Sequence, residues 1–412
     1  MRGESSVSRV RGGLHSAGGI FASQRSRSWQ DWTMTENIAA HEQPAAESPI
    51  PHAGLSSAPH AGGPTPVASD TDWAPDILGA GYYQQTFDLP EDEEGAVVVT
   101  VVKYAPDADP RPVTRPEKPR FAMVAVHGWN DYFYQTELAR HVAEMGGAFF
   151  AVDLRKYGRS LRPWQTHGFT TDLSVYDGDI HLGIRTARTE TGDGVPIVLY
   201  GHSTGGLITA LWANRYPKQI DALVLNSPWL EFQASTALRQ LGTPLLELAA
   251  RLNPKAALPL PDNGYYQRVL EAWRPEGIHT ITGTPADTDD PFWTTGWRPD
   301  PQLRTYPSPP TRVGWLSAIL EGHARVAQGL AIPCPVLVLT SARSNMQSTW
   351  TEDFRSSDNV LDVQQIWKRI PDLGRHVTLI KLDGAIHDVL FSRREVREEG
   401  FAHIAQFLNA YV

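Results

Sequence analysis

Short apolar runs alternate with amphipathic segments from residue 121 to residue 228, and this alternation constrains the fold more than any other feature. Runs that are apolar throughout are typical of strands buried on both faces, as in a parallel sheet with helices on each side. The sequence therefore predicts an α/β fold with a mostly parallel central sheet flanked by helices. The predicted strands are 82–89, 95–106, 121–128, 148–160 with its following turn, 195–203, 220–228, 335–340 and 376–382. The predicted helices of the core are 134–146, 171–189, 204–217, 359–371 and 394–411.

The alternation is interrupted over residues 229–330. This stretch holds two helix-like segments, 234–252 and 313–330, around a part rich in Trp, Pro and Tyr. An interruption of this length is too long for plain coil in a compact domain. We expect an inserted helical cap over the carboxyl ends of the strands, where open α/β sheets bind ligands. The core is then formed by 71–228 and 331–412.

The first 70 residues differ in composition from the rest, being rich in Ser, Arg, Gly, Pro and Ala. Such a composition cannot bury enough apolar surface to offset the entropy of ordering, so residues 1–70 are predicted to be disordered. No segment near the start has the apolar length of a signal peptide, and Met34 is an alternative start. No apolar run reaches the roughly 18 residues of a transmembrane helix. We therefore expect a cytoplasmic protein.

Charge and residue usage exclude several classes of function. The formal net charge of −9 argues against a nucleic-acid partner. The single cysteine, Cys334, rules out an internal disulfide framework and is expected to be a buried small residue. No Walker or Rossmann pattern is present and nothing indicates a metal site, so we predict no cofactor.

Ser203 lies in the pentapeptide Gly201-His202-Ser203-Thr204-Gly205, which matches the pattern G-x-S-x-G. The pattern carries chemistry when a strand precedes it and a helix follows it, as predicted here. A serine on such a strand-to-helix turn adopts a strained backbone, and glycines on both sides avoid collisions with neighbouring elements. Ser203 is therefore a candidate nucleophile.

A serine nucleophile needs a base, and for this chain order the base is a histidine near the end of the sheet region. His387 directly follows the predicted strand at 376–382 and satisfies that requirement. The histidines at 181, 323 and 403 fall on helical segments and are expected to be ordinary surface or core residues.

The acid that orients the base is expected after the strand at 335–340. Asp358 stands on the loop that enters the next helix and is the preferred candidate, with Asp353 as the alternative. Asp362 falls within the helical pattern and is expected on its solvated face. The choice between Asp358 and Asp353 stays open at this point.

Two backbone amides are needed to stabilise a developing oxyanion. The amide of Thr204, the residue after the candidate nucleophile, is expected to be the first. The turn in "VHGWND" (126–131) follows the first strand of the alternating region and is expected to present the amide of Trp129 as the second.

Five segments carry a resemblance to a known family: "VHGWND", "VDLRKYGRS", "YGHSTGG", "SSDNVLDV" and "GAIHDVL". In this order they resemble the α/β-hydrolases of the monoacylglycerol lipase/lysophospholipase group, often labelled serine aminopeptidase S33-type hydrolases. The resemblance implies the α/β-hydrolase fold, with Ser203 as nucleophile, Asp358 as acid and His387 as base. It also implies an oxyanion hole formed by the amides of Trp129 and Thr204.

The chain departs from the family pattern at two places. The family usually has D-x-R-G-H-G-x-S, whereas Lys156 and Tyr157 stand at the Gly-His positions here. Residues 341–357 are also inserted between the strand and the favoured acid, Asp358.

These expectations combine into a cofactor-independent serine hydrolase that forms an acyl-enzyme on Ser203 and cleaves carboxylic esters. The resemblance implies monoacylglycerol-like, lysophospholipid-like or small acyl esters as substrates, and transient membrane-surface contact through the cap is an additional expectation. The aromatic residues expected in the cap would suit an apolar acyl or aryl group, although aromatic residues at such positions more often serve simple packing. They are Trp229, Phe232, Trp293, Trp297 and Trp315.

Two alternatives remain, and the oligomeric state is left open. The same three residues could serve an aminopeptidase or a thioesterase, and the acidic stretch 287–291 is a hint of a site for an amino terminus. The fold could also act as a non-catalytic binding module, against which the complete Ser/Asp/His set argues.

Overall fold

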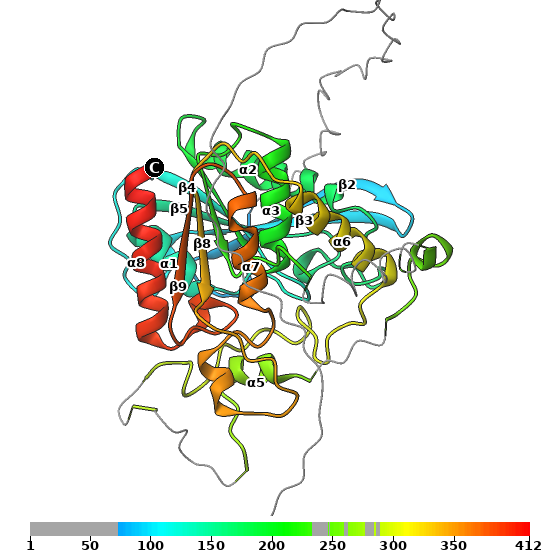
Figure 1. Cartoon of the computed structure of the whole chain (residues 1–412). Helices are drawn as coiled ribbons and strands as arrows, with labels where there is room; N and C mark the ends of the chain where they lie inside the picture. The colour runs from blue at the N-terminus through cyan, green and yellow to red at the C-terminus, as the bar shows by residue number, and fades with distance from the viewer. Residues whose placement is uncertain (1–72, 233–245, 247, 259–262, 277–283, 286–288) are drawn as a thin grey trace, which may run out of the picture. The chain divides into compact units, whose positions relative to one another are not determined.

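The structure is a computed structural model that describes residues 73–232, 246, 248–258, 263–276, 284–285 and 289–412 (Figure 1). The predicted disordered tail, 1–70, lies outside the described residues. Most of the predicted cap helix at 234–252 lies outside them as well.

Within the described residues, nine strands form one sheet in the order β1-β2-β3-β5-β4-β6-β7-β8-β9. The first three strands pair antiparallel with their neighbours, β3 with β5 included, and every pair from β5 to β9 is parallel. The predicted mostly parallel sheet is therefore confirmed. The strands are β1 (Ala74–Pro75), β2 (Tyr82–Asp92), β3 (Gly95–Tyr104), β4 (Phe121–Val126), β5 (Gly147–Asp153), β6 (Ile197–His202), β7 (Ala222–Asn226), β8 (Val336–Ser341) and β9 (Val377–Leu382).

Helices cover both faces of this sheet (Figure 1). Helices α2, α3, α6 and α7 pack on one face, and α1 and α8 pack on the other. The described α-helices are α1 (Thr136–Glu144), α2 (Asp177–Thr191), α3 (Thr204–Arg215), α5 (Tyr265–Leu270), α6 (Val313–Ala327), α7 (Val363–Arg369) and α8 (Arg394–Tyr411).

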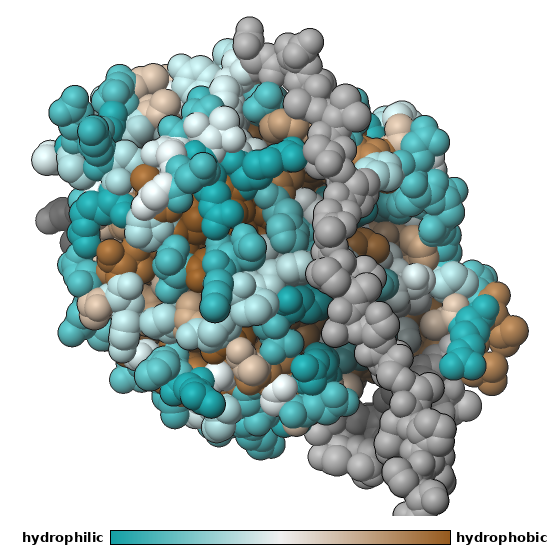
Figure 2. All heavy atoms as spheres, turned by 90° about the horizontal axis from the view of Figure 1, so that it is seen from above, coloured by the Kyte–Doolittle hydropathy of each residue, from teal (hydrophilic) through white to brown (hydrophobic). Residues whose placement is uncertain are grey.

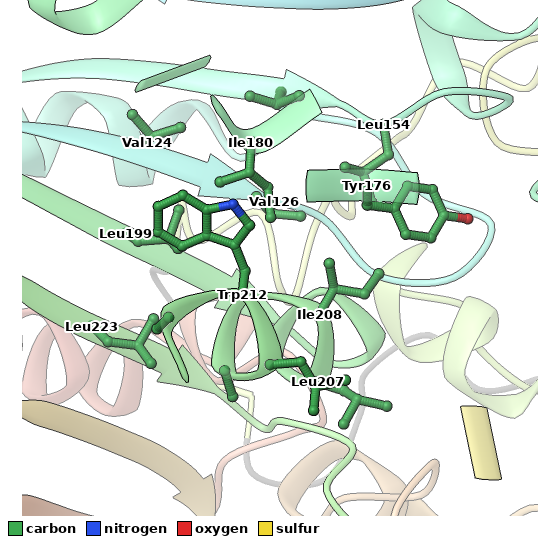
Figure 3. Packing of buried hydrophobic residues seen from close by; sticks show 14 of the residues in the cluster. Val124, Val126, Leu154, Tyr176, Ile180, Leu199, Leu207, Ile208, Trp212 and Leu223 are labelled. Carbon is green, nitrogen blue, oxygen red and sulfur yellow. The ribbon is translucent and has the colours of Figure 1, made fainter. Parts of the chain in front are cut away.

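The apolar runs give two cores because successive side chains of a strand point to opposite faces. In β4, Val124 and Val126 lie in the cluster with α2 and α3, whereas Met123 and Ala125 lie in the cluster with α1 and α8. In the first cluster, Trp212 of α3 is fully buried and packs among Ile180 of α2 and side chains of the sheet (Figure 3). The uniform apolarity of the strands thus reflects burial on both faces.

Helix α6 lies within the stretch 229–330, and the structure confirms the helix predicted there at 313–330. Its residues Leu316, Ile319 and Val326 are buried in the same cluster as α2 and α3. Helix α6 therefore packs against the core that supports the sheet. The assignment of the whole of 229–330 to one separate insertion stays a prediction.

The face of the molecule seen in Figure 2 is mostly hydrophilic, with hydrophobic side chains exposed in small groups between polar ones. No helix in the described part of the chain is both long and apolar enough to cross a bilayer.

Replacing Trp212 by Ala is expected to lower the free energy of unfolding by about 3–5 kcal/mol, since it leaves a large cavity in the core. Urea unfolding followed by circular dichroism measures this loss. The matched control is Trp164→Ala, because the Trp164 side chain is 57% exposed and should cost no more than about 1 kcal/mol. Equal losses in the two variants would contradict the packing described for Trp212.

Candidate active site

Ser203 occupies a strained turn between β6 and α3, with φ 54° and ψ −118°. A positive φ is unfavourable for a residue with a side chain, so close packing must hold it there. A Cβ added to Gly201 would lie 2.3 Å from Thr209 Oγ1, and one added to Gly205 would lie 2.2 Å from the carbonyl oxygen of His127. The two glycines thus let the turn pack against its neighbours, as the sequence pattern predicts.

Three side chains from separate loops form one hydrogen-bonded chain. His387 Nε2 lies 3.0 Å from Ser203 Oγ, and His387 Nδ1 lies 2.9 Å from Asp358 Oδ2. Asp358 and His387 are buried, and Ser203 is half-buried at the wall of a cavity. The structure therefore brings together the three residues that the sequence analysis singled out.

Asp358 is held by the backbone around it. Its Oδ1 accepts hydrogen bonds from the amides of Val360 (2.8 Å) and Leu361 (2.7 Å), which leaves Oδ2 for His387. The chain on either side is tied back to the end of β8, since Ser344 and Asp358 form a β-bridge. The position of the Asp358 carboxylate is fixed by local backbone geometry.

Asp353, the alternative acid, lies elsewhere. Its carboxylate forms an ion pair with Arg343 at 2.5 Å and accepts a hydrogen bond from Asn345, and its side chain is 41% exposed. The hydrogen bond from Arg343 lowers the pKa of Asp353. The structure does not bring Asp353 to His387. Asp362, expected on the solvated face of a helix, instead caps the start of α7 by accepting from the amide of Gln364.

The other histidines considered have partners on or near their own helices. His181 Nδ1 lies 2.7 Å from the carbonyl oxygen of Asp177, and His323 Nε2 lies 2.9 Å from that of Trp229. His403 lies on α8, with Nε2 3.8 Å from Glu399. All three thus have partners other than the Ser203 hydroxyl, as expected of ordinary surface or core residues.

The loop after β4 is oriented by His127. The imidazole Nε2 accepts from the amide of Leu154, so the proton resides on Nδ1, which donates to the carbonyl of Gly128 at 2.8 Å. In a planar trans peptide the carbonyl and the following N–H point in opposite directions, so the Trp129 amide points away from His127. A Cβ on Gly128 would lie 3.1 Å from Ser203 Cβ, which shows how closely this loop approaches the serine.

The amide of Thr204 is the first of α3, where helical amides have no partner within the helix. The carbonyl of Ser203 is engaged by the amides of Gly206 and Trp229 at 3.0 and 2.9 Å. In the described part of the chain, neither the Thr204 amide nor the Trp129 amide has an acceptor. Two unpaired donors therefore belong to residues that border Ser203.

A buried polar network supports the loop that carries His387. Asn226, at the end of β7, donates to Tyr200 Oη at 2.8 Å and to Asp388 Oδ1 at 2.7 Å, and its own Oδ1 accepts from the amide of Val389. Burial lowers the pKa of the neighbouring His202 to about 4. His202 is therefore neutral at physiological pH and adds no positive charge beside His387. Sequence reasoning missed Asn226, although its position at the end of a parallel strand is a signal that could have found it.

The departure at Lys156 and Tyr157 has a structural role. Lys156 has φ 63°, is buried, and forms ion pairs with Asp92 (2.6 Å) and Glu94 (2.7 Å) at the turn between β2 and β3. Burial opposes ionisation of Glu94, but hydrogen bonds from Lys156 and Lys255 lower its pKa to about 2. These contacts tie the loop after β5 to the β2–β3 turn.

Ser203 and His387 line a cavity of about 690 Å³. Its apolar wall includes Leu258, Val360 and prolines, and its polar wall includes Asn130, Asp131 and Arg304, which sequence reasoning missed. The aromatic residues expected to line the site do not belong to this wall, because they pack elsewhere. Trp315 packs against Trp129, for example, with ring planes tilted by 48° and centroids 4.1 Å apart. The remaining prolines and small residues of the wall are Ala257, Pro307, Ser308, Pro309, Pro310 and Thr311.

The described part of the acidic stretch 287–291 contacts helix α8. Asp290 pairs with Arg397 at 2.7 Å, and Asp289 pairs with Arg394. Both aspartates are therefore engaged by arginines of the chain itself. Positions 287 and 288 lie outside the described residues.

Comparison with known proteins places these features in a family context. The sequence profile described as serine aminopeptidase, S33 matches residues 117–393. A monoacylglycerol lipase of Mycolicibacterium smegmatis is 30% identical over 138 residues, which cover 32% of this chain and 44% of that protein. The chain spans less than half the length of the curated relatives it matches.

Two solved structures resemble the described fold. A soluble variant of monoglyceride lipase from Saccharomyces cerevisiae has a TM-score of 0.51 at 15% identity, over 79% of this chain and 94% of that one. A thermostable carboxyl esterase from Bacillus coagulans has a TM-score of 0.52 at 17% identity, over 80% and 98%.

Replacing Gly205 by Ala is expected to lower the melting temperature, because the new Cβ would lie 2.2 Å from a backbone carbonyl that must then shift. Overpacking of this kind costs about 1–3 kcal/mol. The control is Gly194→Ala, since a Cβ at Gly194 meets nothing within 4 Å. Thermal unfolding that is unchanged in Gly205→Ala would show that the turn is looser than described.

Proposed function

The chain belongs to the serine aminopeptidase S33 family and has the α/β-hydrolase fold, and from this premise we propose that it hydrolyses carboxylic esters through an acyl-enzyme on Ser203. The observation that carries the proposal is the chain of hydrogen bonds from Ser203 through His387 to Asp358. The roles of nucleophile, base and orienting acid explain why these three side chains are joined in this order. They also explain why Ser203 is held on a strained turn at a cavity wall.

In the proposed reaction, Ser203 Oγ attacks the ester carbonyl while His387 Nε2 takes its proton. His387 then donates that proton to the departing alcohol, which leaves an acyl-enzyme. A water molecule gives a proton to His387 and attacks the acyl group. His387 then returns that proton to Ser203 Oγ as the bond to the acyl group breaks, which releases the acid and restores Ser203. Asp358 holds the Nδ1–H of His387 and stabilises the imidazolium that forms in each half-reaction.

The amides of Trp129 and Thr204 are the proposed donors to the oxyanion. Support comes from the hydrogen bond that turns the Gly128 carbonyl toward His127, and from the place of Thr204 at the first turn of α3. Donors that are oriented before the reaction stabilise developing charge without reorganisation, which is often the largest catalytic contribution.

The proposed substrates are monoacylglycerol-like, lysophospholipid-like or small acyl esters. The cavity of about 690 Å³ has the size of a site for a small molecule, and its wall is partly apolar. The relatives include a monoacylglycerol lipase and a (lyso)-N-acylphosphatidylethanolamine lipase, the latter from Mus musculus. An aminopeptidase or thioesterase would use the same three residues, and the Oδ1 of Asp131 in the cavity wall, unpaired among the described residues, is an acceptor that an amino terminus could use.

Replacing Ser203 by Ala is expected to abolish labelling by a fluorophosphonate probe and hydrolysis of short acyl esters, because both need the nucleophilic oxygen. In-gel fluorescence and release of p-nitrophenol measure the two losses. The control is Ser174→Ala, which removes an exposed serine and should label like the wild type. Equal labelling of Ser203→Ala and wild type would rule out the proposed nucleophile.

Replacing Asp358 by Asn is expected to lower kcat by about 10⁴-fold, since the amide can no longer hold the imidazole in the required tautomer. The matched variant Asp353→Asn removes a charge from the same loop but should leave kcat near that of the wild type. Ester hydrolysis rates of the two variants decide between them. Loss of turnover in Asp353→Asn alone would show that Asp353 is the acid and that the assignment to Asp358 is wrong.

A further inference from the structure

Arg304 lines the same cavity as Ser203, and the proposed reaction does not use its charge. Its Nη1 donates to Tyr134 Oη at 2.7 Å. The nearest carboxylate among the described residues is that of Asp131, whose Oδ1 lies 4.0 Å away, beyond hydrogen-bond distance. In the same part of the chain, the Nε and Nη2 donors of Arg304 have no acceptor.

Arg159, another buried arginine of this chain, shows what full compensation looks like. Its Nε and Nη2 bind both oxygens of Asp76 at 2.7 and 2.8 Å, and its Nη1 binds Asp153 at 2.9 Å. Nε and Nη2 form the edge of the guanidinium that matches a carboxylate bidentately. Arg304 presents this same edge without a protein carboxylate, although its side chain is only 12% exposed. Among the described residues, the Arg304 charge is balanced only by the Tyr134 hydroxyl, the Tyr266 ring and Asp131 at 4.0 Å, which leaves this edge of the guanidinium open to an anionic partner from outside the chain.

Asp131 compensates Arg304 only in part. Burial raises the pKa of Asp131 to about 7, against the lowering effect of Arg304, and Asp388 and Asp153 raise it further. A substantial fraction of Asp131 is therefore neutral at physiological pH. The Oδ1 atoms of Asp131 and Asn130 also lack a donor among the described residues, so a hydroxyl or ammonium group could bind there. Arg304 always carries a full positive charge, whereas Asp131 is partly neutral and Asn130 is uncharged. We therefore expect the cavity to attract an anionic group more strongly than a cationic one.

Tyr266 connects this charge to the reacting residues. Its ring lies edge-on to the imidazole of His387, with centroids 5.4 Å apart, and the Arg304 guanidinium carbon lies 5.8 Å from the same ring. The ring of Tyr266 thus lies between Arg304 and His387. A substrate whose ester reacts at Ser203 would need only a short spacer to place a second group at Arg304.

We propose that Arg304 is a specificity residue that binds a carboxylate carried by the ester substrate, so that the enzyme prefers half-esters and other carboxylate-bearing esters to neutral esters of equal length. This inference rests on the proposed ester hydrolysis at Ser203. It narrows the substrate class from acyl esters in general to esters with a carboxylate a short spacer from the reacting carbonyl.

The test compares kcat/KM for three benzyl esters with the same six-carbon acyl chain: monobenzyl adipate, benzyl hexanoate and benzyl 6-aminohexanoate. A second pair, 4-carboxybenzyl hexanoate and 4-methylbenzyl hexanoate, places the carboxylate on the alcohol side. We expect the carboxylate-bearing member of at least one series to be preferred by about tenfold or more, the scale of a charge-assisted hydrogen-bonded pair. Chromatography of the released alcohol gives the rates.

In Arg304→Met the ratio of kcat/KM for the carboxylate ester over its neutral partner is expected to fall toward one, and Arg304→Lys should retain part of it. Arg298→Met, which removes an exposed arginine outside the cavity wall, should keep the wild-type ratio. A wild type that shows no preference for either carboxylate ester, or that prefers the amino ester, would overturn the inference. An equal loss of activity on charged and neutral esters in Arg304→Met would also overturn it, because the arginine would then be structural.

Fluorophosphonate labelling of the wild type separates this inference from the proposed function. Labelling at Ser203 with hydrolysis of neutral esters, but without a carboxylate preference, leaves ester hydrolysis intact and removes the role of Arg304. Absence of both labelling and hydrolysis refutes the proposed function, and the inference falls with it.

Discussion

The strained backbone at Ser203 is the constraint on which the rest of the site depends. A φ of 54° is stable only because β6 and α3 leave no room for the chain to relax, and because Gly201 and Gly205 have no side chains to oppose that packing. The turn brings the serine beside the loop after β4, at Gly128, and beside the loop after β9, at His387. The buried clusters on the two faces of the sheet fix the strands from which these loops extend.

Much of this arrangement could be predicted from the sequence because it is encoded locally or by chain order. The alternation of apolar runs and helical segments predicts the parallel sheet, and the glycines around Ser203 predict the sharp turn. His387 follows from its place after the last strand. The acid could not be chosen with the same certainty, since Asp358 and Asp353 lie on the same loop. Only the fold of that loop, in which Arg343 engages Asp353, separates them.

The wall of the cavity could not be predicted, because it is assembled from segments far apart in the chain. Arg304 and Asp131 come from different loops, and nothing in the local sequence of either indicates that they meet. For the aromatic residues the sequence leaves two roles open, the lining of a site and simple packing. Residues such as Trp315 are large enough to line a site, but α6 places Trp315 against Trp129 and the core. Residue type indicates what a wall can be made of, whereas packing decides which residues form it.

The β-bridge between Ser344 and Asp358 pairs the two ends of the intervening segment, which therefore forms a closed loop beyond the end of β8. The amide of Asn345 binds the carbonyl of Asp358, and the amide of Asp358 binds that of Arg343, so the chain leaves and returns through one pair of hydrogen bonds. These two hydrogen bonds fix the backbone at Asp358 from the side of Arg343 and Asn345. The segment between the two ends also contributes to the packing near the site, because its buried Phe354 lies in the same cluster as Ile386, the residue before His387.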